Sequence, residues 1–221
     1  MKKLLIAGAV AASSVSMAVT AESKFEGFSL ELGGASVDYS VQFKNVRNSA
    51  TPTLLEQFKE MSSRESFVDA GLKYTFKMSP KLYLAMSYER TFGDADLGKM
   101  VAASGQSDGT SVAIDNLESF VIAPSYVISD QTLASVRIGY IRNDLLIKNI
   151  DANDPAPAEK FDQNGYSLGF GAQHFITDNI YVGGSFDMMF YDDKTYTTSD
   201  NVLFDLDTDA TKLRLNVGYR F

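Results

Sequence analysis

The chain has 221 residues, a net charge of −8, one histidine and neither cysteine nor tryptophan. The lack of cysteine excludes disulfides and thiolate chemistry, and the acidic balance argues against nucleic acid as a partner. The hydrophobic content of 45% is ordinary for an exported soluble protein, so bulk composition alone does not reveal the fold.

The N-terminal segment has the pattern of a secretory signal peptide. Lys2 and Lys3 precede an apolar run that closes on small residues at Ala21. A transmembrane helix needs about 20 apolar residues, whereas three serines interrupt this run. We therefore predict a signal peptide over residues 1–21 and an exported chain over residues 22–221, which carries a net charge of −10 once the two lysines are removed.

Eight segments of the exported chain alternate apolar and polar residues, which indicates strands with one apolar face. In the last segment, KLRLNVGYRF, every second residue from Leu213 to Phe221 is apolar. An exposed terminal strand would fray, so we expect this strand to pair with the first one in a closed barrel. The predicted strands cover residues 27–35, 66–76, 82–92, 119–128, 134–141, 165–173, 180–190 and 212–221.

The links between these strands alternate between short and long. The short links cover residues 77–81, 129–132 and 176–179, and the long links cover residues 39–63, 93–116, 143–163 and 191–209. A compact soluble domain rarely carries four irregular loops of about 20 residues. Short periplasmic turns and long extracellular loops are typical of a bacterial outer-membrane barrel, and an even number of strands places both termini in the periplasm.

Alternation alone also fits a soluble β-sandwich or a lipocalin-like barrel. The composition of the two strand faces distinguishes these soluble folds from a membrane barrel. The stronger face carries Leu, Val, Ile, Phe, Tyr and Met, while the weaker face carries Gly, Ser, Ala and charged residues. Large apolar side chains suit lipid, and small ones suit the narrow lumen of an eight-stranded barrel. We therefore predict an all-β, eight-stranded antiparallel transmembrane β-barrel.

The last residues carry a resemblance to a known family. The terminal pattern Val217-x-Tyr219-x-Phe221 resembles that of small eight-stranded outer-membrane proteins, such as the barrel of outer membrane protein A, outer membrane protein X and the neisserial surface proteins. The resemblance implies that the barrel-assembly machinery recognises these three residues. Without tryptophan, Tyr and Phe are expected to form the interfacial belts alone.

Seven charged residues share the weaker face and are predicted to form an ion-paired lumen, because buried charges are normally paired. A charge-lined ion pathway is the alternative. Counting from the periplasmic ends predicts two levels: Asp69, Glu89, Asp187 and Arg214 above, and Glu31, Lys73 and Arg137 below.

Three arginines occupy alternating positions that place them on the lipid-facing side of their strands, but they lie near the long loops. Arg64, Arg90 and Arg142 are therefore predicted at the outer rim, level with lipid phosphates that arginine binds in bidentate fashion. We expect them to contact lipopolysaccharide; the alternative is that they simply meet water.

All of the net acidity falls on the four long links, which carry +1, −3, −3 and −5 in chain order. Acidic loops stay soluble and resist self-association, and clustered carboxylates also attract divalent cations. Asp205-x-Asp207-x-Asp209 is the best local candidate, but it lacks the glycine and distal glutamate of a calcium-binding loop. We therefore assign no metal site and no cofactor.

Catalysis finds little support in the sequence. Acyl-transfer chemistry usually needs a histidine base, and His174 lies beside a predicted periplasmic turn with no serine placed next to it. Residues 54–61, LLEQFKEM, are predicted to form a short helix in the first long loop. No loop motif names a ligand, and we predict that the chain is not an enzyme.

These observations predict an integral protein of the Gram-negative outer membrane with a largely closed lumen. Its expected role is envelope integrity or surface interaction, through adhesion or contact with lipopolysaccharide or ions. The expected partners are outer-membrane lipid, lipopolysaccharide, the barrel-assembly machinery and an extracellular ligand, with the protein acting as a monomer. The alternative is a narrow, porin-like channel for ions or small solutes, since open porins have 16 to 18 strands and eight give a filled interior.

Overall fold

The computed structural model describes residues 24–48, 58–101, 107–149, 159–198 and 201–221, and the predicted signal peptide over residues 1–21 lies outside these ranges. The described residues contain no helix that is long and apolar enough to cross a membrane. Within them the strands are β1 (Gly27–Asn48), β2 (Met61–Lys77), β3 (Leu82–Phe92), β4 (Ala95–Val101), β5 (Ser107–Ser129), β6 (Thr132–Asn149), β7 (Glu159–Phe175), β8 (Ile180–Tyr191), β9 (Lys194–Thr197) and β10 (Val202–Arg220).

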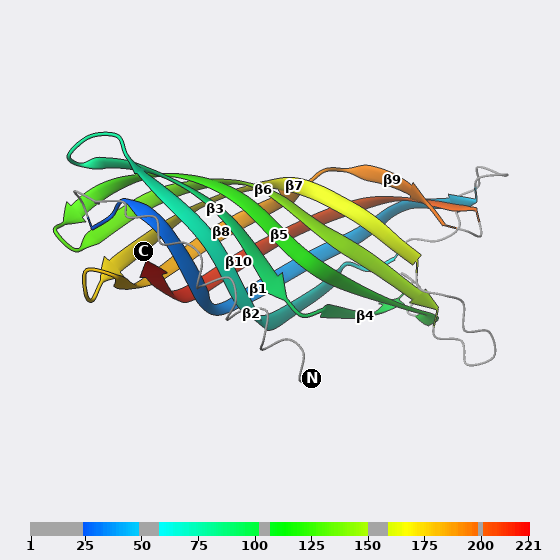
Figure 1. The fold of residues 1–221 in the computed structure, drawn as a ribbon. Helices are drawn as coiled ribbons and strands as arrows, with labels where there is room; N and C mark the ends of the chain where they lie inside the picture. Colours follow the sequence, from blue (N-terminus) through cyan, green and yellow to red (C-terminus); the bar gives the residue numbers. More distant parts are fainter. Residues whose placement is uncertain (1–23, 49–57, 102–106, 150–158, 199–200) are drawn as a thin grey trace.

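Eight of these strands form a closed antiparallel ring in the order β1-β2-β3-β5-β6-β7-β8-β10, which confirms the predicted barrel. The ring closes because β10 pairs with β1 along nearly its whole length, from Arg220 opposite Ser29 to Val202 opposite Asn48. Of the two remaining described strands, β4 pairs with β5 and β9 with β10. Both lie at the end of the barrel away from the short turns and the C-terminus (Figure 1).

The hydrogen-bond register sets the width of the barrel. One row of paired residues runs around the ring and returns to β8 ten residues further along, through Ile180, Tyr219, Leu30, Leu72, Tyr88, Phe120, Tyr140, Tyr166 and Phe190. In an eight-stranded barrel this stagger tilts the strands by about 40° and gives a backbone radius of about 8 Å. Side chains from facing walls are long enough to fill a cylinder of that width.

The strands extend well into the links that the sequence predicted to be loops. β1 continues to Asn48 and β2 begins at Met61, and the described parts of the other long links likewise belong mostly to strands, including β4 and β9. The helix predicted over residues 54–61 is wrong in its described part, where Phe58 forms a β-bridge and Met61 begins β2. Residues 54–57 lie outside the described ranges.

The two faces of β1 exchange their polarity along the strand. In its first part Leu32 is exposed on the outer wall and Glu31 is buried in the lumen; further along, Val41 is buried inside and Gln42 is exposed outside. Apolar side chains face lipid where the wall crosses the membrane, and they turn inward where water surrounds the wall. The outer part of the barrel therefore has a core like that of a soluble protein.

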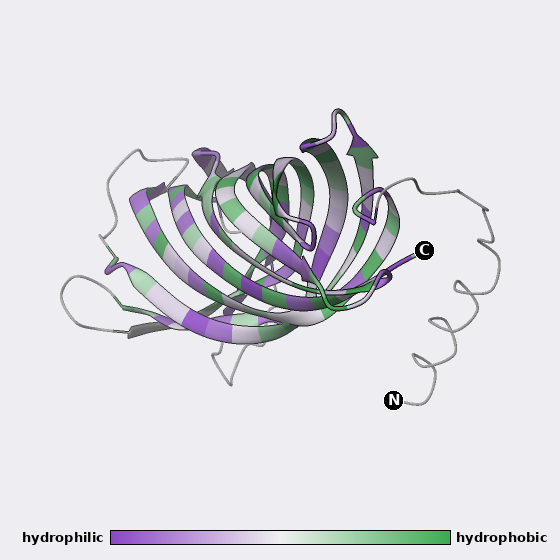
Figure 2. Ribbon diagram, turned by 90° about the vertical axis from the view of Figure 1, so that its left-hand side faces the viewer, coloured by the Kyte–Doolittle hydropathy of each residue, from purple (hydrophilic) through white to green (hydrophobic). Residues whose placement is uncertain are grey.

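The outer surface of the ring carries large exposed apolar side chains. Figure 2 shows hydrophobic and hydrophilic residues alternating along the curved strands. An exposed apolar surface of this extent is a liability in water but is required of a lipid-facing wall, so the soluble alternatives are wrong. The exposed aromatic residues include Phe76, Phe92, Phe120, Tyr126, Tyr140, Tyr166, Phe170, Phe190, Tyr219 and Phe221.

Candidate functional site

The lumen contains a charged layer between two apolar layers. A cluster of four aromatic residues and one leucine, Phe25, Tyr83, Leu133, Phe175 and Tyr181, packs at the periplasmic end. An apolar core fills the extracellular half and includes Val37, Tyr39, Val41, Phe43, Ile114, Ile141, Leu145, Met189, Phe204 and Leu206. We name the charged set between them the charged layer; it consists of Glu31, Asp69, Lys73, Glu89, Arg137, Asp187, Lys212 and Arg214.

Arg214 joins two carboxylates of the charged layer. Its Nη1 lies 2.7 Å from Oε2 of Glu31, and its Nε lies 2.5 Å from Oδ1 of Asp69. Gly71 leaves room for the guanidinium group, because a Cβ at that position would lie 3.0 Å from Nη2 of Arg214. Arg214 therefore links the two levels that the sequence count kept apart, since the side chain spans more than one residue step along the tilted strands.

Two further cations tie the opposite walls together. Arg137 on β6 donates from Nη2 to Glu89 and from Nε to Asp187, each at 2.8 Å. Lys73 on β2 donates to Oε1 of Glu31 at 2.5 Å and to Oε1 of Gln173 at 2.7 Å. Because the partners come from different strands, these ion pairs brace the ring across its interior.

Lys212 also belongs to the charged layer, and the sequence analysis missed it. Its Nζ lies 2.7 Å from Asp69 Oδ2, 3.1 Å from Thr91 Oγ1 and 3.8 Å from Glu89 Oε2. The signal was available, because Lys212 shares the inward parity of Arg214 on β10. With it, the layer has four cations and four carboxylates.

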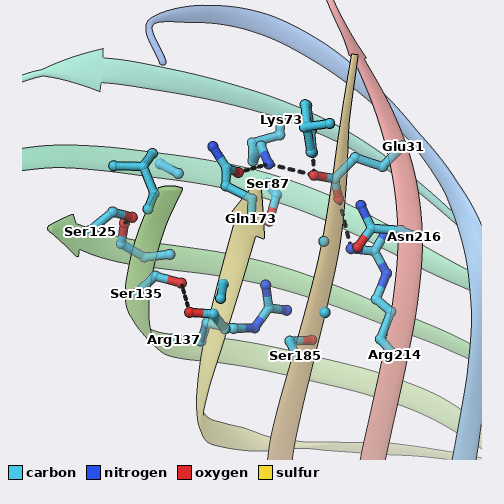
Figure 3. A pocket seen from close by; sticks show the side chains of 18 residues that line it. Glu31, Lys73, Ser87, Ser125, Ser135, Arg137, Gln173, Ser185, Arg214 and Asn216 are labelled. Atoms are coloured by element: carbon cyan, nitrogen blue, oxygen red, sulfur yellow. Dashed lines mark hydrogen bonds and ion pairs between the residues drawn. The ribbon is translucent and has the colours of Figure 1, made fainter. Parts of the chain in front are cut away.

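A small cavity of about 50 Å³ lies beside the charged layer. Lys73, Arg137, Arg214 and Glu31 line it together with serine, alanine and glycine residues (Figure 3). The small residues leave this space open because their short side chains do not fill it. By volume, such a cavity holds a few water molecules.

The apolar core above the charged layer contains isolated polar groups. Asn143 Nδ2 donates to Tyr191 Oη at 2.9 Å, and Gln163 Nε2 donates to Thr208 Oγ1 at 3.0 Å. The side-chain oxygens of Asn143 and Gln163 are buried and accept no hydrogen bond from the described residues. Each of these hydrogen bonds joins two strands that are separated by one strand in the ring, β6 with β8 and β7 with β10.

The three predicted rim arginines lie on the outer wall, each with a polar partner. Arg64 Nη2 lies 2.5 Å from Asp38 Oδ2, Arg142 Nη2 lies 3.5 Å from Asp162, and Arg90 Nη2 lies 3.0 Å from Asn116 Oδ1. Arg90 also lies 3.4 Å from Glu118. Their guanidinium groups stay partly exposed, so they retain donors for a further ligand.

The predicted acidic triplet lies along the outward face of β10, where its members meet local partners. Asp207 pairs with Lys44, and Asp205 accepts hydrogen bonds from Thr195 at 2.6 Å and from Asn45 at 2.7 Å. The hydrogen bonds from Thr195 and Asn45 lower the pKa of Asp205, while burial and then the charge of Asp207 raise the pKa of Asp209. The described residues contain no group of acidic or histidine side chains arranged to hold a metal ion.

The residues of the predicted assembly signal point outward at the end of β10. Val217, Tyr219 and Phe221 are exposed on the lipid-facing wall. The backbone N–H of Phe221 donates to the carbonyl of Phe28 at 2.9 Å, which ties the last residue to β1. These side chains thus remain accessible in the folded barrel.

His174 lies on the outside at the periplasmic end of β7. Its Nδ1 is 3.0 Å from Oγ1 of Thr132, the residue opposite it on β6. In the described part of the chain no carboxylate is hydrogen-bonded to this ring, so nothing there orients the imidazole as a general base.

The ring, its apolar outer wall and its ion-paired interior define an integral β-barrel of the outer membrane of Gram-negative bacteria. The chain belongs to the family of the outer membrane protein beta-barrel domain, whose model matches residues 7–221. A comparison with curated proteins found no match.

Several solved structures are similar to the chain at low sequence identity. OprG from Pseudomonas aeruginosa is 12% identical, with 90% of this chain and 97% of that chain covered and a TM-score of 0.61. Ail, the attachment invasion locus protein of Yersinia pestis, is 15% identical, with 89% and 99% covered and a TM-score of 0.50. The outer membrane protease OmpT from Escherichia coli is 10% identical, with 89% and 97% covered and a TM-score of 0.49.

Proposed function

We propose that this barrel acts through its outer surface, in envelope integrity or surface interaction, and that its lumen is a plug. The charged layer carries the proposal. Eight paired charges within a backbone cylinder of about 8 Å radius, packed between two apolar layers, support a lumen that is closed to solutes.

Solute entry into liposomes that contain the refolded barrel tests the plug. We expect no uptake of small sugars or ions by the wild type, and leakage by a Glu89→Ala, Arg214→Ala double variant, which removes one carboxylate and one cation from the charged layer. The matched control is Asp38→Ala, Arg64→Ala, which removes an acid and an arginine from the outer wall and should leave the liposomes tight. Rapid uptake by the wild type would refute the plug.

Rapid uptake would instead support the alternative, a narrow channel for ions or small solutes. One observation favours it: the cavity beside the charged layer is polar and charged. A rearrangement of ion pairs such as Arg137–Glu89 would be needed to extend this cavity through the layer. Single-channel currents that depend on Glu89 would establish this alternative.

Contact with lipopolysaccharide is the surface role that the outer wall supports best. Arg90 and Arg142 hold their carboxylate partners only at 3.4 Å and 3.5 Å, and arginine prefers close bidentate contact with phosphate. We infer that Arg64, Arg90 and Arg142 bind lipopolysaccharide phosphates. We also infer an extracellular ligand for the protruding strands.

The chemistry of that ligand is expected to differ from the one seen with Ail. Ail has been solved in complex with the heparin analogue sucrose octasulfate, a polyanion. The long links of the present chain carry all of its net negative charge, which disfavours a polyanion without bridging cations. Direct titration of refolded protein with sucrose octasulfate should therefore show no binding; binding would contradict this inference.

Export and assembly complete the proposal. We infer that residues 1–21 are a signal peptide and that the barrel-assembly machinery reads Val217, Tyr219 and Phe221. Phe221→Ala should slow the appearance of the folded, heat-modifiable form in outer membranes, while Phe76→Ala, at another exposed aromatic residue, should not. We further infer a monomer without enzymatic activity. Among the described residues, the ring of His174 is hydrogen-bonded to Thr132 alone, and each strand of the barrel is paired on both sides.

A further inference from the structure

The cavity beside the charged layer has an uneven charge. Lys73, Arg137 and Arg214 line it, together with one carboxylate, Glu31. The three carboxylates on the other side of these cations, Asp69, Glu89 and Asp187, do not line it. We propose that this cavity is a binding site for a small monatomic anion of the size of chloride.

The single carboxylate at the cavity is already fully engaged. Oε1 of Glu31 accepts hydrogen bonds from Lys73 at 2.5 Å and from the hydroxyl of Tyr181 at 2.6 Å, and Oε2 accepts one from Arg214 at 2.7 Å. Three donors, two of them cationic, surround this one charge. The potential at the neighbouring space is therefore dominated by the cations.

Two of these cations have N–H groups that donate no hydrogen bond to the described residues. Lys73 has three N–H donors, of which two are used on Glu31 and Gln173, and its Nζ also lies 4.4 Å from the centre of the Tyr181 ring. Arg214 keeps Nη2 buried without a partner among the described residues. A buried donor without a partner is unfavourable, and more so when it is charged, so an anion or a water molecule that reached Nη2 of Arg214 would stabilise this layer.

The size and lining of the cavity limit its occupant. A volume of about 50 Å³ admits a few water molecules or one monatomic anion with part of its hydration shell, but not a sugar. The lining also contains Ser87, Ser125, Ser135, Ser185 and Asn216. The four serine hydroxyls donate within the barrel, to Glu89, Ala123, Gly171 and Asp187. The side-chain amide of Asn216 is therefore the neutral group that can replace water lost by a halide on entry.

The affinity is expected to be modest. The charged layer as a whole is neutral, because its four cations face four carboxylates. Attraction for the anion therefore comes from the local excess of cations at the cavity and from the unused donors. The site does not depend on the surface role proposed above, since an anion can complete the plug whatever the loops bind.

Bromide in place of chloride provides the direct test. The barrel is refolded and crystallised in sodium bromide, so that the ion is enclosed during folding, and anomalous scattering is measured at the bromine edge. We expect a peak in the cavity near Lys73, Arg137 and Arg214. A map with water alone in the cavity, or with bromide only on the outer surface, would overturn the proposal.

Matched variants test the same site in solution. The midpoint of urea unfolding is measured in sodium chloride and in sodium gluconate, whose anion is too large to enter, at equal ionic strength. We expect a higher midpoint in chloride for the wild type, because a ligand that binds only the folded state stabilises it. Lys73→Gln should lose this difference, and Lys44→Gln, which removes the same charge from the exposed pair with Asp207, should keep it.

Heat-modifiable gel mobility shows that each variant is folded before it is compared. Equal midpoints of the wild type in the two salts would count against the site, as would an undiminished chloride effect in Lys73→Gln. A bromide peak in the wild-type cavity would still establish the site if Lys73→Gln did not fold.

Discussion

The ammonium group of Lys212 lies 2.7 Å from Oδ2 of Asp69, and the two side chains are 2% and 0% exposed. Removing one partner of a buried ion pair leaves an uncompensated charge, which costs about 3–5 kcal/mol. Asp69 also contacts Arg214 and Thr91, so the loss falls at the lower end of that range.

We therefore expect Lys212→Met to lower the free energy of unfolding by about 3 kcal/mol. The measurement is equilibrium unfolding in urea with the protein refolded into lipid vesicles. Lys44→Met breaks the exposed pair with Asp207 and should cost less than about 1 kcal/mol. Equal losses in the two variants would contradict the buried position of Lys212.

The apolar core of the extracellular half makes a second prediction. Leu145 is fully buried in this core, whereas its neighbour Leu146 lies on the other face of β6 and is half-buried. Leu145→Ala should lower the free energy of unfolding by about 2–5 kcal/mol because it leaves a cavity, and Leu146→Ala by clearly less. Similar values for both would mean that the outer extension has no packed core.

The contact between rim arginines and lipopolysaccharide can be measured through stability. Each basic residue near an anionic surface contributes about 1 kcal/mol. Arg90→Gln, Arg142→Gln should therefore reduce the extra stability that lipopolysaccharide confers over phosphatidylcholine vesicles by about 2 kcal/mol.

Lys194→Gln, on β9 beyond the rim, is the control for this pair and should leave the difference unchanged. An unaltered lipopolysaccharide effect in the arginine double variant would show that these side chains simply meet water.

A pH-dependent prediction concerns Asp115, which lies on the extracellular side of the lipid-facing Phe120. Burial raises the pKa of Asp115, and the nearby carboxylates of Asp94 and Asp144 raise it further, against the N–H of Asn116. A raised folded-state pKa means that ionisation opposes folding at neutral pH and that this cost vanishes as the pH falls through the folded pKa.

Asp115→Asn should therefore stabilise the barrel at neutral pH by less than about 1 kcal/mol, because the site is partly exposed. The gain should shrink towards the reference aspartate pKa of about 4. Asp130→Asn, in the turn between β5 and β6, is the control. A gain that grows with acidity would show that the sign is wrong.

The alternation of apolar and polar residues in the sequence was sufficient to predict the ring of eight strands, but not the length of those strands. The membrane part of β1 shows the expected pattern, with Leu30 and Leu32 outside and Glu31 inside. The extension of β1 to Asn48 was not predicted. The two faces of the strand exchange polarity near Gly34, and this exchange interrupts the alternation on which strand prediction depends.

The charged layer was only partly predictable for a related reason. Parity along each strand identifies which side chains enter the lumen, and Lys212 satisfied that criterion as well as Arg214 did. Which charges meet is a different matter, because it depends on the ten-residue stagger around the ring and on the reach of each side chain. Gly71 and Gly169, whose missing Cβ atoms admit Arg214 and Asp187, give no sign of their partners in the sequence.

The exchange of polarity along β1 also fixes how deep the barrel sits. Sinking towards the periplasm would draw Asp38 and its partner Arg64 into hydrocarbon, where arginine costs up to about 2–4 kcal/mol. Rising would lift Leu30 and Leu32 out of the lipid. The wall therefore specifies the thickness of the bilayer that it fits, and a membrane of another thickness has to deform around it, because the strands cannot slide to compensate.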